Sequence, residues 1–167
     1  RLGTLSRAFD IRIVDSVGST NTALMEAALV GAADGTVICA EHQLAGKGRR
    51  GRQWHSVLGG SLTFSVLWRF ESGLQSLAGL SLAAGLAVAR AINRHSRHPA
   101  RLKWPNDVLV DYRKLAGILV EVQGDYWPYL IDAMIKLLGQ VGSDPRWRED
   151  VIVGLERLGR AGNYHYD

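Results

Sequence analysis

The sequence has few of the residues that build cross-linked or redox-active proteins. Its 167 residues include one cysteine, two methionines, three phenylalanines and four prolines. A single cysteine excludes an intrachain disulfide and a cysteine-rich zinc site. This residue, Cys39, lies in an apolar stretch, which favours a buried and unreactive thiol. We therefore expect a protein of a reducing compartment, the cytoplasm.

Long hydrophobic runs are also absent. The uncharged segment 72–89 contains serines, a glutamine and three glycines, which favours a buried helix over a membrane span. The N-terminal residues do not resemble a signal peptide. We therefore expect no membrane partner.

Positive charge is concentrated in one short segment. The net charge is +4, and four cations lie between positions 47 and 52: Lys47, Arg49, Arg50 and Arg52. Because the rest of the chain is formally neutral, this pattern favours a local anion site over a nucleic-acid-coating surface. With 47% hydrophobic residues, the chain is expected to form one globular domain over residues 1–167.

Hydrophobic periodicity predicts the order of the secondary structure. We expect strands over 11–14, 36–41, 61–70, 101–104, 108–111 and 115–123, helices over 22–30, 77–95 and 127–140, and a long loop over 42–60. The clearest strand, 61–70, alternates apolar and polar residues, which predicts one buried and one exposed face. The fold class is α/β (α+β), with a mixed, largely antiparallel sheet and helices on one face.

The glycine-rich segment formally matches a dinucleotide-binding pattern at Gly46, Gly48 and Gly51. That pattern requires a helix after the third glycine, whereas here a strand follows, so neither a dinucleotide fold nor a P-loop is expected. Flexible backbone combined with guanidinium groups instead suggests a loop that orders around phosphate. A solvated basic loop and an RNA-contacting segment remain alternatives.

Two further segments are unusual. Residues 103–107 read Lys-Trp-Pro-Asn-Asp, which indicates a bend between two strands. Lys114 opens the next strand and can reach a carboxylate or a phosphate, while Gly117 suggests close approach of a ligand or another backbone. Each segment alone also has a purely structural explanation.

Taken together, these segments resemble a known family. The matching motifs are Ser19-Thr20-Asn21, the stretch 41–54, Lys103-Trp104-Pro105-Asn106-Asp107 and 114–119. In order and spacing they resemble the catalytic domain of biotin protein ligases (biotin–[acetyl-CoA-carboxylase] ligases) over residues 11–124. The resemblance implies the mixed-sheet fold shared with class II aminoacyl-tRNA synthetases.

The resemblance also implies a reaction. Biotin and ATP form biotinyl-5'-AMP, and the acyl group then passes to a lysine of a biotin carboxyl carrier domain. Mg²⁺ is expected to accompany ATP, and no protein metal-ligand set is assigned. The expected partners are biotin, ATP, the carrier domain and a second copy in a homodimer. No nucleic acid is expected, because no N-terminal helix-turn-helix precedes the domain.

Site roles follow from the resemblance, position by position. The biotin-contacting residues of the family match Ser19, Thr20, Asn21 and Gln43, and its adenylate loop matches Gly46, Lys47, Gly48 and Arg49. Its adenine neighbour matches Trp54, and the ATP and metal side matches Lys103, Asn106 and Asp107. The strand at the biotin carboxyl matches Lys114 and Gly117. Lys114 and Arg49 are the expected catalytic residues. Asp107 either coordinates Mg²⁺ or orients a lysine.

The sequence departs from the family after Glu121. A strand with a Gly-x-Gly-x-Asn pattern and a small C-terminal β domain are not recognisable. A non-catalytic biotin-binding relative is therefore an alternative, as is a lipoate or octanoate ligase or transferase of the same fold. An RNA-binding domain would rest on the basic loop alone.

Overall fold

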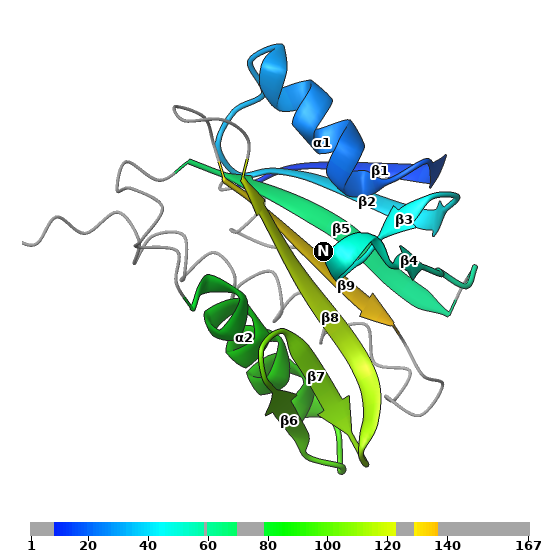
Figure 1. Ribbon diagram of the computed structural model, residues 1–167, viewed down its shortest axis with the longest axis vertical. Coiled ribbons are helices and arrows are strands. Elements are labelled where there is room, and N and C mark those ends of the chain that lie inside the picture. The colour runs from blue at the N-terminus through cyan, green and yellow to red at the C-terminus, as the bar shows by residue number, and fades with distance from the viewer. Residues whose placement is uncertain (1–8, 59, 70–78, 123–128, 137–167) are drawn as a thin grey trace, which may run out of the picture.

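The computed structural model describes residues 9–58, 60–69, 79–122 and 129–136, which form one main sheet, two helices and a small hairpin (Figure 1). The main-sheet strands are β1 (Asp10–Val17), β2 (Thr36–Gln43), β5 (Ser61–Trp68), β6 (Ala100–Lys103), β7 (Asp107–Val110), β8 (Arg113–Val122) and β9 (Tyr129–Lys136). The helices are α1 (Thr20–Leu29) and α2 (Leu80–His95). The predicted start of the second helix, at 77, lies outside the described residues.

The sheet has seven strands in the order β1-β2-β5-β9-β8-β7-β6. β1 runs parallel to β2, and all other neighbouring strands are antiparallel. This confirms the mixed, largely antiparallel sheet predicted from the sequence.

The helices pack on opposite faces of the sheet, which differs from the expected placement on one face. On β2 the adjacent residues Val37 and Ile38 belong to different hydrophobic clusters, and successive strand side chains point to opposite faces. Ile38 and Leu67 pack with Leu24 of α1. Val37 packs in the cluster that contains the buried residues of α2. We call the two sides of the sheet the α1 face and the α2 face.

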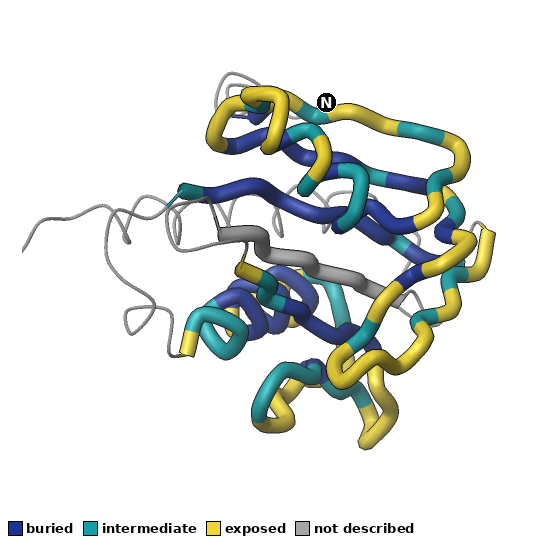
Figure 2. The backbone as a smooth tube through the Cα atoms, turned by 45° about the horizontal axis from the view of Figure 1, so that its top comes forward, coloured by how far each residue is buried: buried dark blue, intermediate teal, exposed yellow. Residues whose placement is uncertain are grey.

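The larger core lies on the α2 face. Small side chains let α2 approach the sheet closely, and a Cβ at Gly85 would lie 3.0 Å from Leu102 Cδ2. Figure 2 shows buried residues along the central strands and α2, with exposed residues mainly in the turns and along β1. The core members from α2 and from the strands at its end of the sheet are Ala84, Ala87, Val88, Ala89, Ala91, Ile92, Ala100, Val108, Leu115, Ala116 and Ile118. Cys39 is only partly buried and packs against this core.

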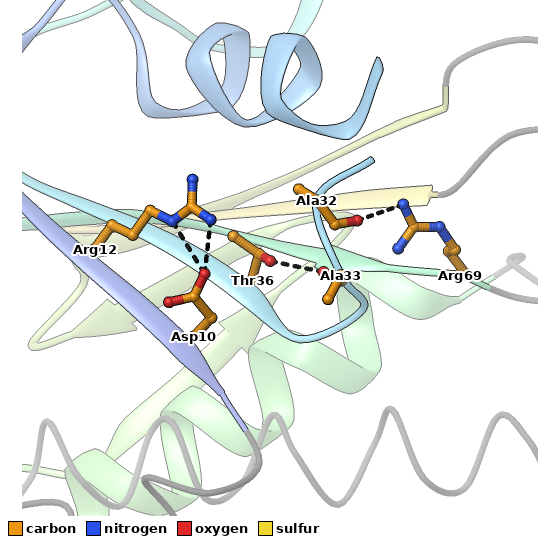
Figure 3. Close-up of polar contacts among 6 residues, drawn as sticks. All are labelled: Asp10, Arg12, Ala32, Ala33, Thr36 and Arg69. Carbon is orange, nitrogen blue, oxygen red and sulfur yellow. Dashed lines mark hydrogen bonds and ion pairs between the residues drawn. The ribbon is translucent and has the colours of Figure 1, made fainter. Parts of the chain in front are cut away.

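Polar contacts fix the chain that follows α1. The Thr36 hydroxyl donates to the Ala33 carbonyl (2.7 Å), and Arg69 Nη2 donates to the Ala32 carbonyl (2.6 Å). The Arg69 backbone N–H donates to Asp34 Oδ1 at 2.7 Å. Figure 3 shows the first two contacts beside the ion pair that Asp10 makes within β1. The loop before β2 is thus tied to the end of β5.

Both faces of β5 are buried, so the prediction of a half-exposed strand is wrong. Its polar residues Ser61, Thr63 and Ser65 are 5%, 0% and 0% exposed. Each makes a hydrogen bond: Thr63 donates to the Ala40 carbonyl, Ser65 to Thr20, and Ser61 accepts from the Val57 N–H. Alternation of apolar and polar residues is therefore compatible with a polar face that is buried against other polar groups, as well as with a polar face that is exposed to water.

The predicted helix over 127–140 is also wrong, because residues 129–136 form β9. This strand pairs with β5 on one side and β8 on the other. The predicted loop 42–60 contains a small hairpin of β3 (Gly46–Lys47) and β4 (Gln53–Trp54), joined through a 3-10 turn, η2 (Arg49–Gly51). Within the described ranges, neither helix is long and apolar enough to cross a membrane.

Candidate functional site

The start of α1 carries a buried polar network. The backbone N–H and the hydroxyl of Thr20 both donate to Gln43 Oε1, at 2.7 and 3.0 Å. Ser65 of β5 donates to the Thr20 hydroxyl at 2.9 Å. All three residues are buried, with Gln43 the most exposed at 3%. Ser65 is not among the residues predicted for the site, because its place in an alternating strand suggests an exposed face.

Asn21 lies beside this network and is fully buried. Neither its amide oxygen nor its amide nitrogen has a hydrogen-bond partner among the residues that the structure describes. Leaving such a group unpaired costs about 1–3 kcal/mol for each donor or acceptor. Ser19, also buried, caps α1 by accepting from the Thr22 N–H at 3.4 Å. The unpaired amide points to a polar ligand at this end of the helix.

A second group surrounds Lys114. Its Nζ lies 2.7 Å from Asp107 Oδ1 and 5.0 Å from the centre of the Trp54 ring. A Cβ at Gly117 would lie 3.1 Å from Lys114 Nζ and 3.2 Å from the Trp54 ring, so a side chain there would crowd both. The indole nitrogen of Trp54 is buried and has no partner within the described part of the chain.

An irregularity in β8 directs Lys114 into this group. Along the hairpin, Val108 pairs with Ala116 but Leu109 pairs with Lys114, so Leu115 is an extra residue. In a regular strand, residues two apart share a face, which would put Lys114 with Ala116 on the α2 face. The β-bulge shifts the alternation by one residue and turns Lys114 onto the α1 face, with Gly117.

The β3–β4 hairpin joins the two groups. A Cβ at Gly46 would lie 2.7 Å from the Trp54 carbonyl oxygen and 3.2 Å from Gln43 Nε2, so only glycine fits between them. The Ser56 hydroxyl accepts from the Gln43 N–H at 2.7 Å and donates to its carbonyl at 3.2 Å. The polar network and the lysine group therefore flank one hairpin.

The turn of this hairpin carries Arg49. Its Nη1 donates to Asn106 Oδ1 at 3.3 Å, and the Asn106 side chain donates to the Ile118 carbonyl at 3.0 Å. The next residues, Arg50 and Gly51, have left-handed backbones with φ of 59° and 72°. This turn aims Arg49 across the hairpin toward the segment that precedes β7.

The remaining predicted site residues lie around these groups. Lys103 ends β6 directly opposite Asp107 in the sheet. Lys47 and Gly48 stay on the hairpin, where Lys47 is exposed and the Gly48 N–H donates to the Arg52 carbonyl at 2.7 Å. No cluster of three or more His, Cys, Asp or Glu side chains able to hold a metal occurs among the described residues. Asp107 is the carboxylate that pairs with Lys114.

The chain is similar in sequence to proteins of a known family. Residues 13–130 match the Biotin/lipoate A/B protein ligase family. The bifunctional ligase/repressor BirA of Escherichia coli is 40% identical over 114 residues, which cover 68% of this chain and 35% of the relative. The biotin–[acetyl-CoA-carboxylase] ligase of Mycobacterium tuberculosis is 46% identical over 115 residues, or 66% of this chain and 43% of that protein.

Solved structures agree at the level of the fold. The biotin protein ligase of Aquifex aeolicus, solved in complex with biotin and ATP, superposes with a TM-score of 0.70 at 27% identity, covering 92% of this chain and 69% of that one. The chain spans between about a third and a half of the length of the curated relatives named above. On its sequence and its fold, the chain belongs to the biotin/lipoate A/B protein ligase family.

Proposed function

We propose that the chain activates biotin with ATP to form biotinyl-5'-AMP and transfers the biotinyl group to a lysine of a carrier domain. The observation that carries this proposal is a single surface, the α1 face, on which a buried polar network and a cationic group flank one hairpin. A ligand with a neutral polar head at one end and a carboxylate at the other fits such a surface. The names of the relatives support biotin as that ligand.

The polar network suits the ureido ring of biotin, which offers one carbonyl acceptor and two N–H donors. Asn21 has an unpaired amide with both a donor and an acceptor. Gln43 Oε1 already accepts two hydrogen bonds from Thr20. This orients the Gln43 amide and turns its Nε2 toward Gly46. In the proposal, the side-chain amides of Asn21 and Gln43 therefore form hydrogen bonds with the ureido ring, and Thr20 holds Gln43 in place.

The cationic group suits the chemical step. A biotin carboxylate oxygen attacks the α-phosphorus of ATP, the bond to the β-phosphate oxygen breaks, and pyrophosphate leaves. Both reactants are anions, so positive charge must offset their repulsion. Lys114, held by Asp107 against Trp54, and Arg49, on the turn of the hairpin beside Asn106, supply that charge. The second step is attack by a carrier lysine on the acyl carbonyl, with AMP as the leaving group and loss of one proton.

Mg²⁺ fits this site only when it is bound together with the phosphates of the nucleotide. The described residues offer Asp107 without two further ligands, whereas Mg²⁺ commonly binds through one or two carboxylates plus substrate phosphates. When bound, it would neutralise phosphate charge. Asp107 would hold it on the Lys114 side of the site.

The experiment that tests the proposal is biotin-dependent exchange of labelled pyrophosphate into ATP, which reports the first step alone. Wild-type protein is expected to exchange only when biotin is present. Lys114→Ala is expected to lower the rate at least 100-fold with an unchanged far-ultraviolet circular dichroism spectrum, since the exposed Lys114 side chain does not build the core. Arg90→Ala, which also removes an exposed cation but from α2, serves as the matched control. Exchange that persists in Lys114→Ala would refute the assigned role.

A second candidate, a biotin-binding protein without catalysis, is favoured by one observation. The strand that follows β8 is present as β9, but its sequence, YLIDAMIK, contains no glycine. The family resemblance implies a glycine-rich strand after β8 that shapes the adenine pocket. Biotin binding measured by calorimetry without any pyrophosphate exchange would establish this second candidate in place of the first.

A further inference from the structure

The α1 face continues beyond Lys114 to the edge of the sheet. Lys103 pairs with Asp107 across β6 and β7, and Arg101 pairs with Leu109 in the next row of the same face. β6 is the last strand of the sheet, and Arg101 and Lys103 are both exposed. We call Arg101, Lys103, Leu109 and Tyr112 the β6 shelf.

The shelf is hollowed. A pocket of about 270 Å³ is lined by all four shelf residues and by Pro99, Leu102 and Asp111. Its lining combines two cations and one carboxylate with aliphatic and aromatic carbon. Such a mixture binds a partner that carries negative charge together with apolar side chains.

Tyr112 lies in the two-residue turn between β7 and β8 and is exposed to water. Its side chain is 91% exposed, and its backbone lies in the left-handed region at φ 62°. The preceding residue of the same turn, Asp111, is also left-handed, at φ 48°. A two-residue hairpin turn requires such a backbone at both positions, and glycine, asparagine and aspartate adopt it most readily. The turn thus holds a large aromatic side chain in water, and tyrosine is among the residues that dominate binding energy at interfaces.

The charge of the shelf is positive. Asp111, the acidic residue of the pocket lining, lies 2.9 Å from His98 Nδ1, so its carboxylate already faces a partner. Arg101 and Lys103 form no ion pair with any residue that the structure describes. The groups left to meet a partner are therefore cationic.

The shelf also adjoins the group around Lys114 on the same face of the sheet. Arg101 is two residues from Lys103 along β6, or about 7 Å. Lys103 in turn faces Asp107, which holds Lys114. A protein whose lysine reaches an acyl group at Lys114 must rest its own surface beside that point, and the shelf is a neighbouring surface on the same face.

On these observations, and resting on the proposed function, we propose that the β6 shelf docks the carrier domain through acidic and apolar residues that surround its target lysine. Tyr112 packs against the apolar part of that surface, and Arg101 pairs with a carboxylate. Arg101 and Tyr112 of the shelf thereby select which lysine is modified, while the first reaction step does not depend on these two residues.

The test uses the purified chain with the apo biotin carboxyl carrier domain of an acetyl-CoA carboxylase as the probe. Binding is measured by calorimetry at low and high salt, and the first step by pyrophosphate exchange without carrier. Arg101→Glu and Tyr112→Ser are each expected to weaken carrier binding about tenfold, with exchange rates within twofold of wild type. Arg90→Glu, with the same charge change on α2, is expected to change neither.

A second probe tests the charge pairing. In this probe, the acidic residues of the carrier near its target lysine are changed to amides. The changed carrier is expected to bind the wild-type chain as weakly as the original carrier binds Arg101→Glu, and combining the two changes is expected to weaken binding no further. The proposal is overturned if the chain does not bind the carrier, or if both shelf variants bind it like wild type. Loss of binding in the shelf variants without any pyrophosphate exchange in wild type would support the docking surface and refute the proposed function.

Discussion

Replacing Gly117 with alanine tests whether close packing positions Lys114. The new Cβ would lie 3.1 Å from Lys114 Cε and Nζ and 3.2 Å from Trp54 Cζ3, whereas ordinary contacts begin at about 3.4 Å. Both neighbours are side chains, so Lys114 and the Trp54 ring must move by at least a few tenths of an ångström. The β8 backbone beneath them can remain in place, because no backbone atom is among the three nearest contacts.

The expected result is a loss of rate with little loss of stability. A displacement approaching 1 Å at a reacting group costs about 100-fold in rate, so a smaller shift of Lys114 is expected to lower pyrophosphate exchange about 10- to 100-fold. Replacing glycine by alanine lowers the entropy of the unfolded chain, a gain of about 0.4–1 kcal/mol that offsets part of the crowding. The melting temperature is therefore expected to change by less than about 4 °C.

Gly18→Ala provides a matched control, since a Cβ there meets nothing within 4 Å. It is expected to keep the wild-type exchange rate and melting temperature. If Gly117→Ala exchanges pyrophosphate as fast as the control variant, the contact among Lys114, Gly117 and Trp54 does not position the lysine, and the reasoning fails.

Three further predictions follow from the same structure. Arg49→Ala removes a charge-assisted contact to the adenylate, so the intermediate is expected to dissociate at least tenfold faster in a chase experiment while biotin affinity stays within twofold; equal losses would contradict a role on the phosphate. Asn21→Leu removes a buried unpaired amide and is expected to raise the melting temperature of the free protein while weakening biotin binding at least tenfold by calorimetry; unchanged affinity would refute its contact with the ring. Burial raises the pKa of Asp34, so the native protein keeps that proton to higher pH than the unfolded chain, and the stability it contributes at low pH is lost as pH rises through the native pKa. The urea-unfolding free energy of Asp34→Asn, relative to wild type, is therefore expected to increase between acidic and neutral pH, and a pH-independent difference would contradict this.

Local sequence signals were sufficient where one periodicity dominated. The alternation over 61–70 predicted β5, and the small and apolar residues of 77–95 predicted the helix that packs on the sheet. The family motifs predicted that Lys114 and Asp107 belong to one site, and the structure brings them within 2.7 Å. Their catalytic roles stay predictions.

The predictions failed where contacts distant in sequence decide the structure. Residues 129–136 contain good helix formers, yet they form β9 because β5 and β8 both offer hydrogen-bonding edges. In the same way Asp15 and Ser16, which lie beyond the predicted strand 11–14, extend β1 because it pairs in parallel with β2. Propensity is a weak guide when a gap between two strands is available.

The sequence also could not show which face the polar residues meet. Ser65 and Thr63 alternate with apolar residues as exposed positions do, but α1 and the Ala40 carbonyl cover them. The Asn21 amide was predicted as a ligand contact, but only the structure shows that it is buried without a partner.

The bulge at Leu115 has a consequence for rigidity. In a regular strand, one residue of each neighbouring pair faces the core, whereas here Leu115 and Ala116 are both buried in it, at 1% and 0% exposure. The backbone next to Lys114 therefore has two consecutive anchors close to the start of its strand, where strands normally fray. Amide protons at 115 and 116 are expected to exchange with solvent far more slowly than those at the start of β1, so the lysine stands on one of the least mobile segments of the sheet.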